Sequence, residues 1–328
     1  MIVLDERFPT MGVTARILAE YPDAVGEDAA RAEVAAARAR IEALAAALTR
    51  FDPASELSAF NRDPSPAVRV SPDLGEAVVH AVAAAHRTGG LVDPTLLDAL
   101  EAGGYARSRA GRPPVDLVAA LADAPARRPA RPRAEQPWAA VVVAPDLRTI
   151  HRPPGVRIDL GGVGKGLAAD AAAALLRRAD RRAVDVGGDL ALGGPGLHER
   201  PWSVDVRDPW SGGVAHTLRL GPGGAATSGL DVRLWRDGEG RPRHHLLDPA
   251  TGEPAWTGLV AATALAPSAV RAEAAAKAAF LAGPVAGYEV LRRHGGALAL
   301  EDGRTRLVGV RPAPPVVRLP ARALRGAA

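Results

Sequence analysis

The sequence contains no cysteine. This absence excludes disulfide bonds, thiolate metal ligands, a cysteine nucleophile and lipid attachment to cysteine. The chain also lacks an apolar run of about 18 residues, the length that a membrane-spanning helix requires. Near the N-terminus, Asp5, Glu6 and Arg7 stand where a secretion signal needs apolar residues. Together these absences predict a cytoplasmic protein without membrane insertion.

Lysine is almost absent, because Lys165 and Lys277 are the two lysines among 41 basic residues and all the others are arginine. The compact ammonium of lysine and the planar guanidinium of arginine suit different sites. Each lysine lies inside a candidate motif. Both are therefore candidates for a functional role, with chance retention as the alternative.

The densest arginine cluster consists of Arg127, Arg128, Arg131 and Arg133. It belongs to a stretch rich in Gly, Arg and Pro, residues 107–137, which we expect to be a surface excursion with one short helix at 117–122. No aromatic side chains are interleaved with these arginines to stack on bases. We therefore interpret the cluster as a solvated loop and expect no nucleic-acid partner.

Strand and helix patterns are interspersed, which predicts an α+β fold, a single compact domain of mixed strands and helices. The domain is expected to span residues 1–312, with a mobile tail at 313–328. Apolar spacing and capping residues predict helices at 27–49, 71–88, 167–178 and 269–282, and a helix plus hairpin at 285–310. A turn into a strand is expected at 8–20, and strands are expected at 139–143, 149–158, 182–186, 202–206, 215–220 and 258–264.

A glycine cluster at 161–166 follows Asp159 and opens an alanine-rich helix. Glycines adopt backbone angles closed to other residues and let a ligand approach bare amides. The helix N-terminus and Lys165 add positive charge, so the pattern predicts an anion site for phosphate. The spacing fits neither a P-loop, since Gly166 follows Lys165, nor a dinucleotide fingerprint, since Leu167 replaces the third glycine. A turn without a ligand is the alternative.

Five motifs occur along the chain. They are SELSAFN at 55–61, LVDPT at 91–95, IDLGGVGKG at 158–166 with GGD at 187–189, ATSG at 226–229, and HHLLDPATGEP at 244–254. In this order and combination they resemble the ApbE-type FAD:protein FMN transferases, from Met11 to the helix that contains Glu273. The resemblance implies an ApbE, T-fold-like architecture and an enzyme that uses FAD, usually with magnesium. Such an enzyme transfers FMN to a Thr or Ser hydroxyl of an acceptor flavoprotein and releases AMP.

The resemblance also implies which residues form the site. By matching positions, the FAD site would be lined by Met11, Phe51, Leu91, Val92, Asp93, Asp159, Lys165 and Leu247. Phe51 would lie near the aromatic part of the flavin nucleotide, and Lys165 would face its phosphates. His245 is the expected general base, because the acceptor hydroxyl loses a proton as it attacks and histidine titrates near neutrality. The alternative is that His244 and His245 belong to an ordinary strand-to-turn edge.

The chain departs from the family at the metal site. The resemblance implies magnesium bound by a backbone carbonyl, here that of Gly162, and by an Asp and a Thr in the pattern A-D-A-x-x-T. Glu273 stands at the Asp position and Lys277 at the Thr position, and an ammonium does not coordinate magnesium at ordinary pH. We hypothesise that the Lys277 ammonium, paired with Glu273, takes the position of the metal. The alternative is a helix-surface pair worth about 0.2–0.5 kcal/mol.

Val13 replaces the threonine of the family's Met-Gly-Thr sequence. Three other functions remain open. One is an FAD pyrophosphatase that yields FMN and AMP, and another is an FAD-binding protein without transferase activity. A nucleic-acid binder is the weakest, and predicts a steep salt dependence. The expected absence of a secretion signal implies an acceptor protein in, or facing, the cytoplasm.

Overall fold

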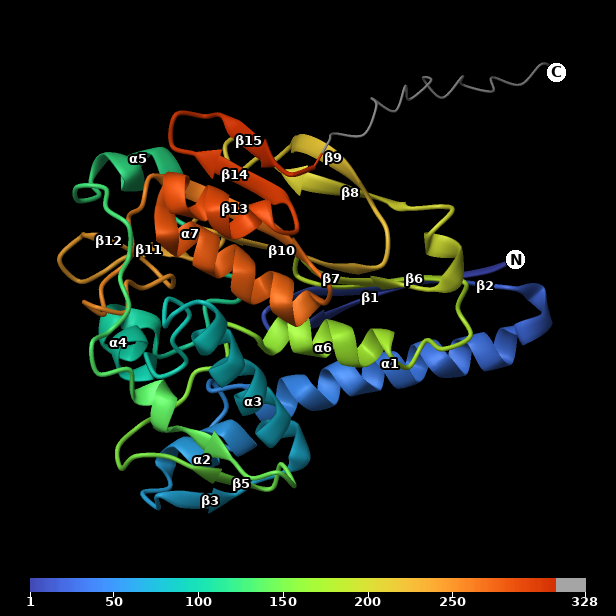
Figure 1. Cartoon of the computed structure of the whole chain (residues 1–328), viewed down its shortest axis with the longest axis horizontal. Helices are drawn as coiled ribbons and strands as arrows, with labels where there is room; N and C mark the ends of the chain where they lie inside the picture. Colours follow the sequence, from blue (N-terminus) through green and yellow to red (C-terminus); the bar gives the residue numbers. More distant parts are fainter. Residues whose placement is uncertain (311–328) are drawn as a thin grey trace.

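The computed structural model describes residues 1–310. The tail predicted at 313–328, and the last two residues of the predicted domain, lie outside the described residues. Within the described part, antiparallel strands form a sheet in the order β1-β2-β6-β7-β10-β13-β14-β15 (Figure 1). The strands are β1 (Ile2–Thr10), β2 (Val13–Tyr21), β6 (Arg181–Val186), β7 (Asp189–Gly193), β10 (Gly223–Gly229), β13 (Leu259–Ala266), β14 (Gly296–Leu300) and β15 (Thr305–Val308).

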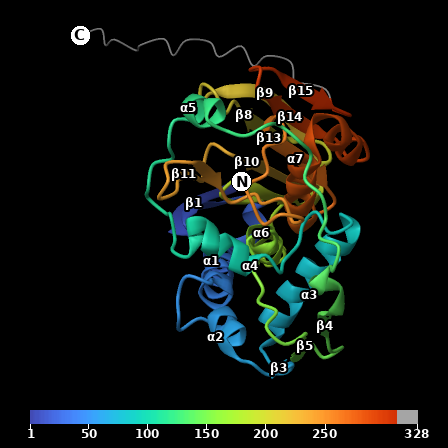
Figure 2. The ribbon, with the colours of Figure 1, turned by 90° about the vertical axis from the view of Figure 1, so that its left-hand side faces the viewer.

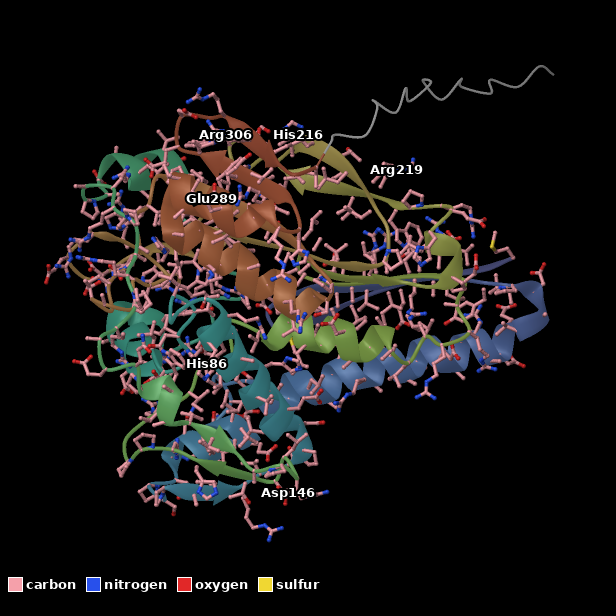
Figure 3. All side chains as sticks on the ribbon, in the orientation of Figure 1. His86, Asp146, His216, Arg219, Glu289 and Arg306 are labelled. Carbon is pink, nitrogen blue, oxygen red and sulfur yellow. The ribbon has the colours of Figure 1, made fainter. Side chains whose placement is uncertain are left out.

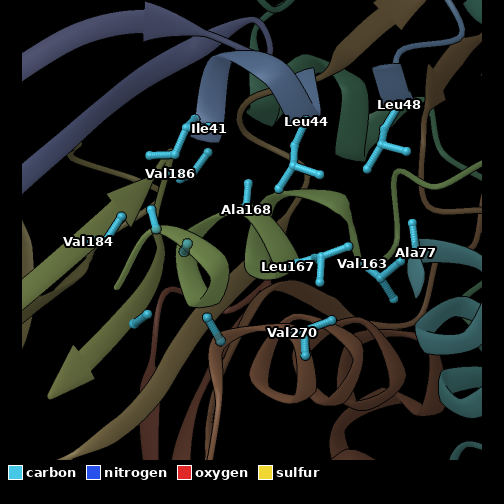
Figure 4. Packing of buried hydrophobic residues seen from close by; sticks show 14 of the residues in the cluster. Ile41, Leu44, Leu48, Ala77, Val163, Leu167, Ala168, Val184, Val186 and Val270 are labelled. Atoms are coloured by element: carbon cyan, nitrogen blue, oxygen red, sulfur yellow. The ribbon is translucent and has the colours of Figure 1, made fainter. Parts of the chain in front are cut away.

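Three helices cover one face of this sheet. They are α1 (Glu27–Leu48), α6 (Gly164–Ala173) and α7 (Ala269–Arg292), and α6 packs between the other two (Figure 2). Apolar side chains from α1, α6 and β6 meet in the core between helices and sheet (Figure 4). The helix predicted at 27–49 is confirmed, and its apolar stripe of Val34, Ile41, Leu44 and Leu48 is buried. Within residues 1–310, every helix is too short or too polar to span a bilayer.

Smaller elements surround this core. They are α2 (Glu56–Arg62), α3 (Pro72–Arg87), α4 (Leu97–Leu100), α5 (Leu117–Ala122), a sheet of β3 (Ala67–Arg69), β5 (Thr149–His151) and β4 (Val142–Val143), and the hairpins β8 (Trp202–Arg207) with β9 (Val214–Leu220) and β11 (Leu234–Arg236) with β12 (Pro242–His244). Figure 3 shows His216 and Arg219 of β9, with Arg306 of β15, along one outer edge of the molecule.

Local capping chemistry sets the starts of two helices. The Ser55 hydroxyl accepts a hydrogen bond from the Ser58 amide at 3.1 Å, and the Ser71 hydroxyl accepts one from the Leu74 amide at 3.3 Å. Each bond satisfies an amide that has no partner within its helix. The predicted capped starts are thus confirmed, as are α5 and the ranges of β6, β8, β9 and β13, with small shifts at their ends.

The turn into a strand predicted at 8–20 agrees with the turn that leads into β2, but the sequence did not reveal β1, which begins at residue 2 and pairs with β2. The chain turns through Met11 and Gly12, whose φ angles are 47° and 71°. Two left-handed residues form the tight turn that matches the twist of a hairpin. The charged residues of β1 concealed this strand. One of them, Asp5, forms a two-point ion pair with Arg16 of β2 on the exposed face.

Two more predicted strands are shorter than expected. A 3₁₀ turn at Pro137–Ala140 leaves only two residues for β4. The strand predicted at 149–158 ends at His151, shortly before Pro153 and Pro154. Proline has no N–H to donate to a neighbouring strand, so the pairing stops there.

The central helix was predicted at 167–178, whereas α6 begins and ends earlier. None of the glycines at 161, 162, 164 and 166 has a positive φ, contrary to the expectation of unusual backbone angles. At Gly166, a Cβ would lie 2.6 Å from the carbonyl oxygen of Ala269. This glycine therefore permits α6 and α7 to approach closely.

We predict that Gly166→Ala lowers the free energy of unfolding by about 1–3 kcal/mol, because the added methyl overlaps the backbone of α7. Gly164→Ala is a matched control two residues away, since a Cβ there meets nothing within 4 Å. The control should leave stability unchanged or raise it by up to about 1 kcal/mol. Urea unfolding monitored by circular dichroism compares the two variants. Equal stability of both would contradict the close-packing role.

Candidate functional site

A cavity of about 400 Å³ opens at the start of α6, and its size lies in the range of small-molecule sites. Its walls come from the β1–β2 turn, the end of α1, the loop before α4, the glycine turn, the segment after β12, and α7. All the predicted FAD-site residues line it, namely Met11, Phe51, Leu91, Val92, Asp93, Asp159, Lys165 and Leu247. Segments far apart in the sequence therefore meet at one cavity.

The predicted general base and metal-site residues do not all line the cavity. Gly162, His245 and Lys277 line the cavity. Glu273 does not line it, because its side chain lies behind Lys165 and is 1% exposed. The carboxylate thus acts on the cavity only through its neighbours.

The Glu273 carboxylate is fully engaged by the first turn of α6. Its Oε1 accepts a hydrogen bond from Lys165 Nζ at 2.9 Å, and its Oε2 accepts one from the Gly166 amide at 2.9 Å. Lys165 also donates to Asp189, at the start of β7, which is 1% exposed. Lys165 was predicted to face phosphates, and the structure adds that two buried carboxylates hold its ammonium.

Lys277 lies beside this group. Its Nζ donates to the carbonyl oxygen of Gly161 at 3.1 Å and lies 3.9 Å from Glu273 Oε1. The hypothesis that Lys277 pairs with Glu273 in the interior thus agrees with the geometry. The contacted carbonyl is that of Gly161 instead of Gly162. A helix-surface pair is ruled out, because Glu273 is buried and the Lys277 side chain is 14% exposed.

Burial and mutual attraction set the pKa values in this cluster. Burial raises the pKa of Asp189 to about 7, although the nearby Lys165 ammonium opposes the rise. Burial also acts to raise the pKa of Glu273, but Lys165 and Lys277 outweigh it, so that pKa is lowered. Burial lowers the pKa of Lys277, against the attraction of Glu273. The ionisation states of the four groups, two carboxyl groups and two amines, therefore depend on one another.

These residues do not fit a magnesium site. Among residues 1–310, no three His, Asp or Glu side chains are grouped as metal ligands. Magnesium requires oxygen ligands in near-octahedral geometry. Both Glu273 oxygens already accept hydrogen bonds from the protein, and the Lys277 ammonium occupies the space beside them.

Arg50 is a cavity residue that the sequence did not reveal. Its guanidinium is stacked on Phe51 at 4.2 Å and on Tyr105 at 4.7 Å, measured to the ring centroids. Its Nε lies 2.7 Å from Asp159 Oδ2, and its side chain is 5% exposed. Among the described residues, Nη2 has no hydrogen-bond partner. The only signal in the sequence is the position of Arg50 directly before Phe51.

The arginine-rich excursion also reaches the site. Arg133 Nε lies 3.6 Å from Asp93 Oδ2, and Arg133 Nη2 donates to the Thr95 hydroxyl at 3.0 Å. Asp93 is oriented by Thr95, whose amide donates to Oδ1 at 2.7 Å. The interpretation as a solvated loop therefore fails for Arg133, while Arg127, Arg128 and Arg131 are exposed. An arginine among prolines carries no sequence signal for this long-range contact.

The two adjacent histidines have different environments. His244 is fully buried, its Nδ1 accepts a hydrogen bond from the Leu246 amide at 3.2 Å, and its ring meets Trp256 edge-on. Burial lowers the pKa of His244 to about 3, with a smaller effect from the Arg243 charge. His244 is thus a neutral core residue.

His245 instead lines the cavity, and its ring meets that of Tyr105 at 6.4 Å between centroids. Burial, with the positive charges of Arg233 and Lys277, lowers its pKa well below 6.5. Its Nδ1 has no hydrogen-bond partner among the described residues. Because Nδ1 is buried, Nε2 is the nitrogen of this neutral imidazole that can accept a proton from a molecule in the cavity.

The model of the ApbE family matches residues 11–300. The chain therefore belongs to the ApbE family, and the resemblance drawn from the five motifs is confirmed.

Named relatives share parts of this chain. The FAD:protein FMN transferase of Escherichia coli (strain K12) is 34% identical over 146 residues, which are 43% of this chain and 41% of that protein. The FAD:protein FMN transferase of Rhodobacter capsulatus is 32% identical over 223 residues, 65% of this chain and 39% of that protein. The chain thus spans about two fifths of the length of these curated relatives.

A solved structure matches over a longer range. The ApbE protein from Thermotoga maritima superimposes with a TM-score of 0.75 at 26% identity, over 94% of this chain and 97% of that protein. The predicted α+β, ApbE-like fold is confirmed.

The buried, neutral state of His244 should make the free energy of unfolding depend on pH. In the unfolded chain this histidine takes up a proton near pH 6.5, whereas in the folded protein it stays neutral to about pH 3. Between these values only the unfolded state binds the proton. As the pH falls, His244 therefore lowers the free energy of unfolding by up to about 1.4 kcal/mol per pH unit.

Urea titrations of wild type and His244→Asn at pH 7 and pH 4 measure this effect. Asparagine keeps an acceptor for the Leu246 amide and does not titrate. The stability advantage of the wild type over the variant should shrink as the pH falls. A constant difference would show that His244 does not contribute.

Proposed function

We propose that this chain is an FAD:protein FMN transferase, which moves FMN from FAD to a Thr or Ser hydroxyl of an acceptor flavoprotein and releases AMP. The observation that carries the proposal is the meeting of all the predicted FAD-site residues and His245 at one cavity. Family membership and the names of the relatives support it.

The cavity offers different surfaces to the parts of FAD. Phe51 and Tyr105, with Arg50 stacked on both rings, form an aromatic wall suited to a planar ring system. The glycine turn, Lys165 and Lys277 form a positive wall suited to the pyrophosphate. In this assignment the nucleotide lies across the cavity with its phosphates at the start of α6.

The reaction is a displacement at phosphorus. The acceptor hydroxyl oxygen forms a bond to the phosphorus of the FMN half, and the bond from that phosphorus to the bridging oxygen breaks. AMP leaves with the bonding electron pair. The hydroxyl proton passes to a ring nitrogen of His245, which is neutral at pH 7 because burial and nearby positive charge lower its pKa.

The resemblance also implies magnesium as a cofactor, with Gly162 and Glu273 as ligands. Because the residues present do not fit that ion, no step of the reaction is assigned to it. The cytoplasmic location and the identity of the acceptor residue as Thr or Ser stay predictions.

The test measures AMP release from FAD by liquid chromatography, together with the mass of a flavinylation-motif acceptor protein. The proposal predicts AMP only in the presence of acceptor, with an FMN-sized mass gain on the acceptor. AMP without acceptor would indicate an FAD pyrophosphatase. FAD binding without AMP, checked with more than one acceptor, would indicate a binding protein.

We predict that His245→Asn lowers the transfer rate by about 10²- to 10⁴-fold, the usual contribution of a general base. FAD affinity should stay close to that of the wild type. His216→Asn is the control, because His216 lies on the outer edge of β9 (Figure 3). If both variants retain full activity, His245 is not the base.

In Asp189→Asn, which removes a carboxyl group whose pKa is about 7, the rate should show no loss between pH 7.5 and pH 6.5, because the lowered pKa keeps His245 unprotonated there. Measuring kcat/KM for AMP release over this range tests the assignment. A fall with an apparent pKa near 6.5 would contradict it.

A further inference from the structure

We infer that the ammonium group of Lys277 replaces a divalent cation in this protein, so that it binds and cleaves FAD without metal. The inference rests on the proposed function and specifies what neutralises the pyrophosphate. It follows from three features of the buried cluster: where Lys277 lies, how Glu273 is occupied, and how the charged groups are paired.

Lys277 lies between the glycine turn and Glu273, beside the cavity wall where we place the phosphates of FAD. Its Nζ contacts a backbone carbonyl of the glycine turn at 3.1 Å and faces Glu273 at 3.9 Å. A carbonyl and a carboxylate are also the types of ligand that a hard cation takes. The ammonium therefore satisfies the same two oxygen groups with hydrogen bonding and charge.

The ammonium also keeps capacity for a ligand. Lysine has three N–H donors, and the bond to Gly161 uses one of them. A side-chain Cβ at Gly162 would lie 3.8 Å from Lys277 Nζ. Because position 162 is glycine, the space next to the ammonium stays open, and both Gly162 and Lys277 line the cavity.

Both oxygens of Glu273 are already held by hydrogen bonds from α6. Oε1 accepts from Lys165 and Oε2 accepts from the Gly166 amide, both at 2.9 Å. A metal at this carboxylate would compete with these hydrogen bonds for the same oxygens and would lie beside the positive charges of Lys165 and Lys277. Both effects oppose metal binding.

Two ammonium groups face two carboxyl groups in this cluster. Lys165 and Lys277 carry two positive charges, while Glu273 and Asp189 carry up to two negative charges in the interior. Lys165 lies between both carboxylates, whereas Lys277 makes its shortest contact with a neutral carbonyl. Lys277 is thus the cation that a pyrophosphate oxygen can engage, and Lys165 holds the cluster together behind it.

In the transfer step, negative charge grows on the bridging oxygen as its bond to the FMN phosphorus breaks. An ammonium that donates to a phosphate oxygen stabilises this charge without exchanging ligands. AMP departs with the electron pair, and the proton of the acceptor hydroxyl is on His245.

The experiment begins with the wild-type full chain. Calorimetric titration with MgCl₂ alone, and FAD titrations in EDTA or in magnesium, measure metal binding and its influence on FAD. We expect no magnesium binding and equal FAD affinity in both buffers. AMP release with acceptor should proceed at the same rate in EDTA and in magnesium.

Two charge-removing variants on the same helix test the role of Lys277. Lys277→Met should weaken FAD binding by about 10- to 100-fold, the effect of losing a charged hydrogen bond. Arg271→Met removes an exposed charge from α7 and should bind FAD like the wild type. Circular dichroism and the thermal midpoint show whether each variant is folded.

The outcomes separate this inference from the proposed function. Magnesium binding to the wild type, or loss of FAD affinity in EDTA, would overturn the inference even if transfer occurs. Metal-independent FAD binding that weakens in folded Lys277→Met supports it even if no acceptor is modified. Equal FAD affinity of folded Lys277→Met and Arg271→Met would overturn it. If Lys277→Met does not fold, the wild-type metal measurements decide.

Discussion

The buried carboxylate of Glu273 determines how the helices and the cavity of this protein are arranged. Transferring an ionised carboxylate from water to a protein interior costs several kcal/mol unless partners compensate. Here the partners are the Lys165 ammonium and the Gly166 amide, both in the first turn of α6. This requirement fixes α6 against α7, and Gly166 permits the close approach because it has no side chain.

The same cluster gives the cavity its electrostatic character. Lys165 joins Glu273 of α7 to Asp189 of β7, so one ammonium links two helices and the central sheet. Lys277 extends the positive wall toward the cavity, while Phe51 and Tyr105, with Arg50 stacked on both rings, form an aromatic wall. A cavity that joins a positive wall to an aromatic wall suits a nucleotide, which carries phosphates next to planar rings.

Local features of the sequence predicted much of this structure. The apolar spacing of α1 and the serine caps of α2 and α3 are determined by neighbouring residues, and the five motifs identified the cavity residues by family resemblance. The features that the sequence did not predict are contacts between residues far apart in the chain. Lys165 meets Glu273 across 108 positions, and Arg133 reaches Thr95 across 38. Strand β1 was missed because it carries the charged residues Asp5 and Glu6, whose partners Arg16 and Arg38 are distant in the sequence.

A crystal structure of the full chain with FAD and manganese would test the central claim most directly, since manganese gives an anomalous signal and binds magnesium-type oxygen sites. We expect no anomalous peak near Glu273. We also expect Lys277 Nζ to lie within hydrogen-bond distance of a pyrophosphate oxygen. A manganese peak bound to Glu273 and the glycine-turn carbonyl, with Lys277 turned away, would contradict the claim.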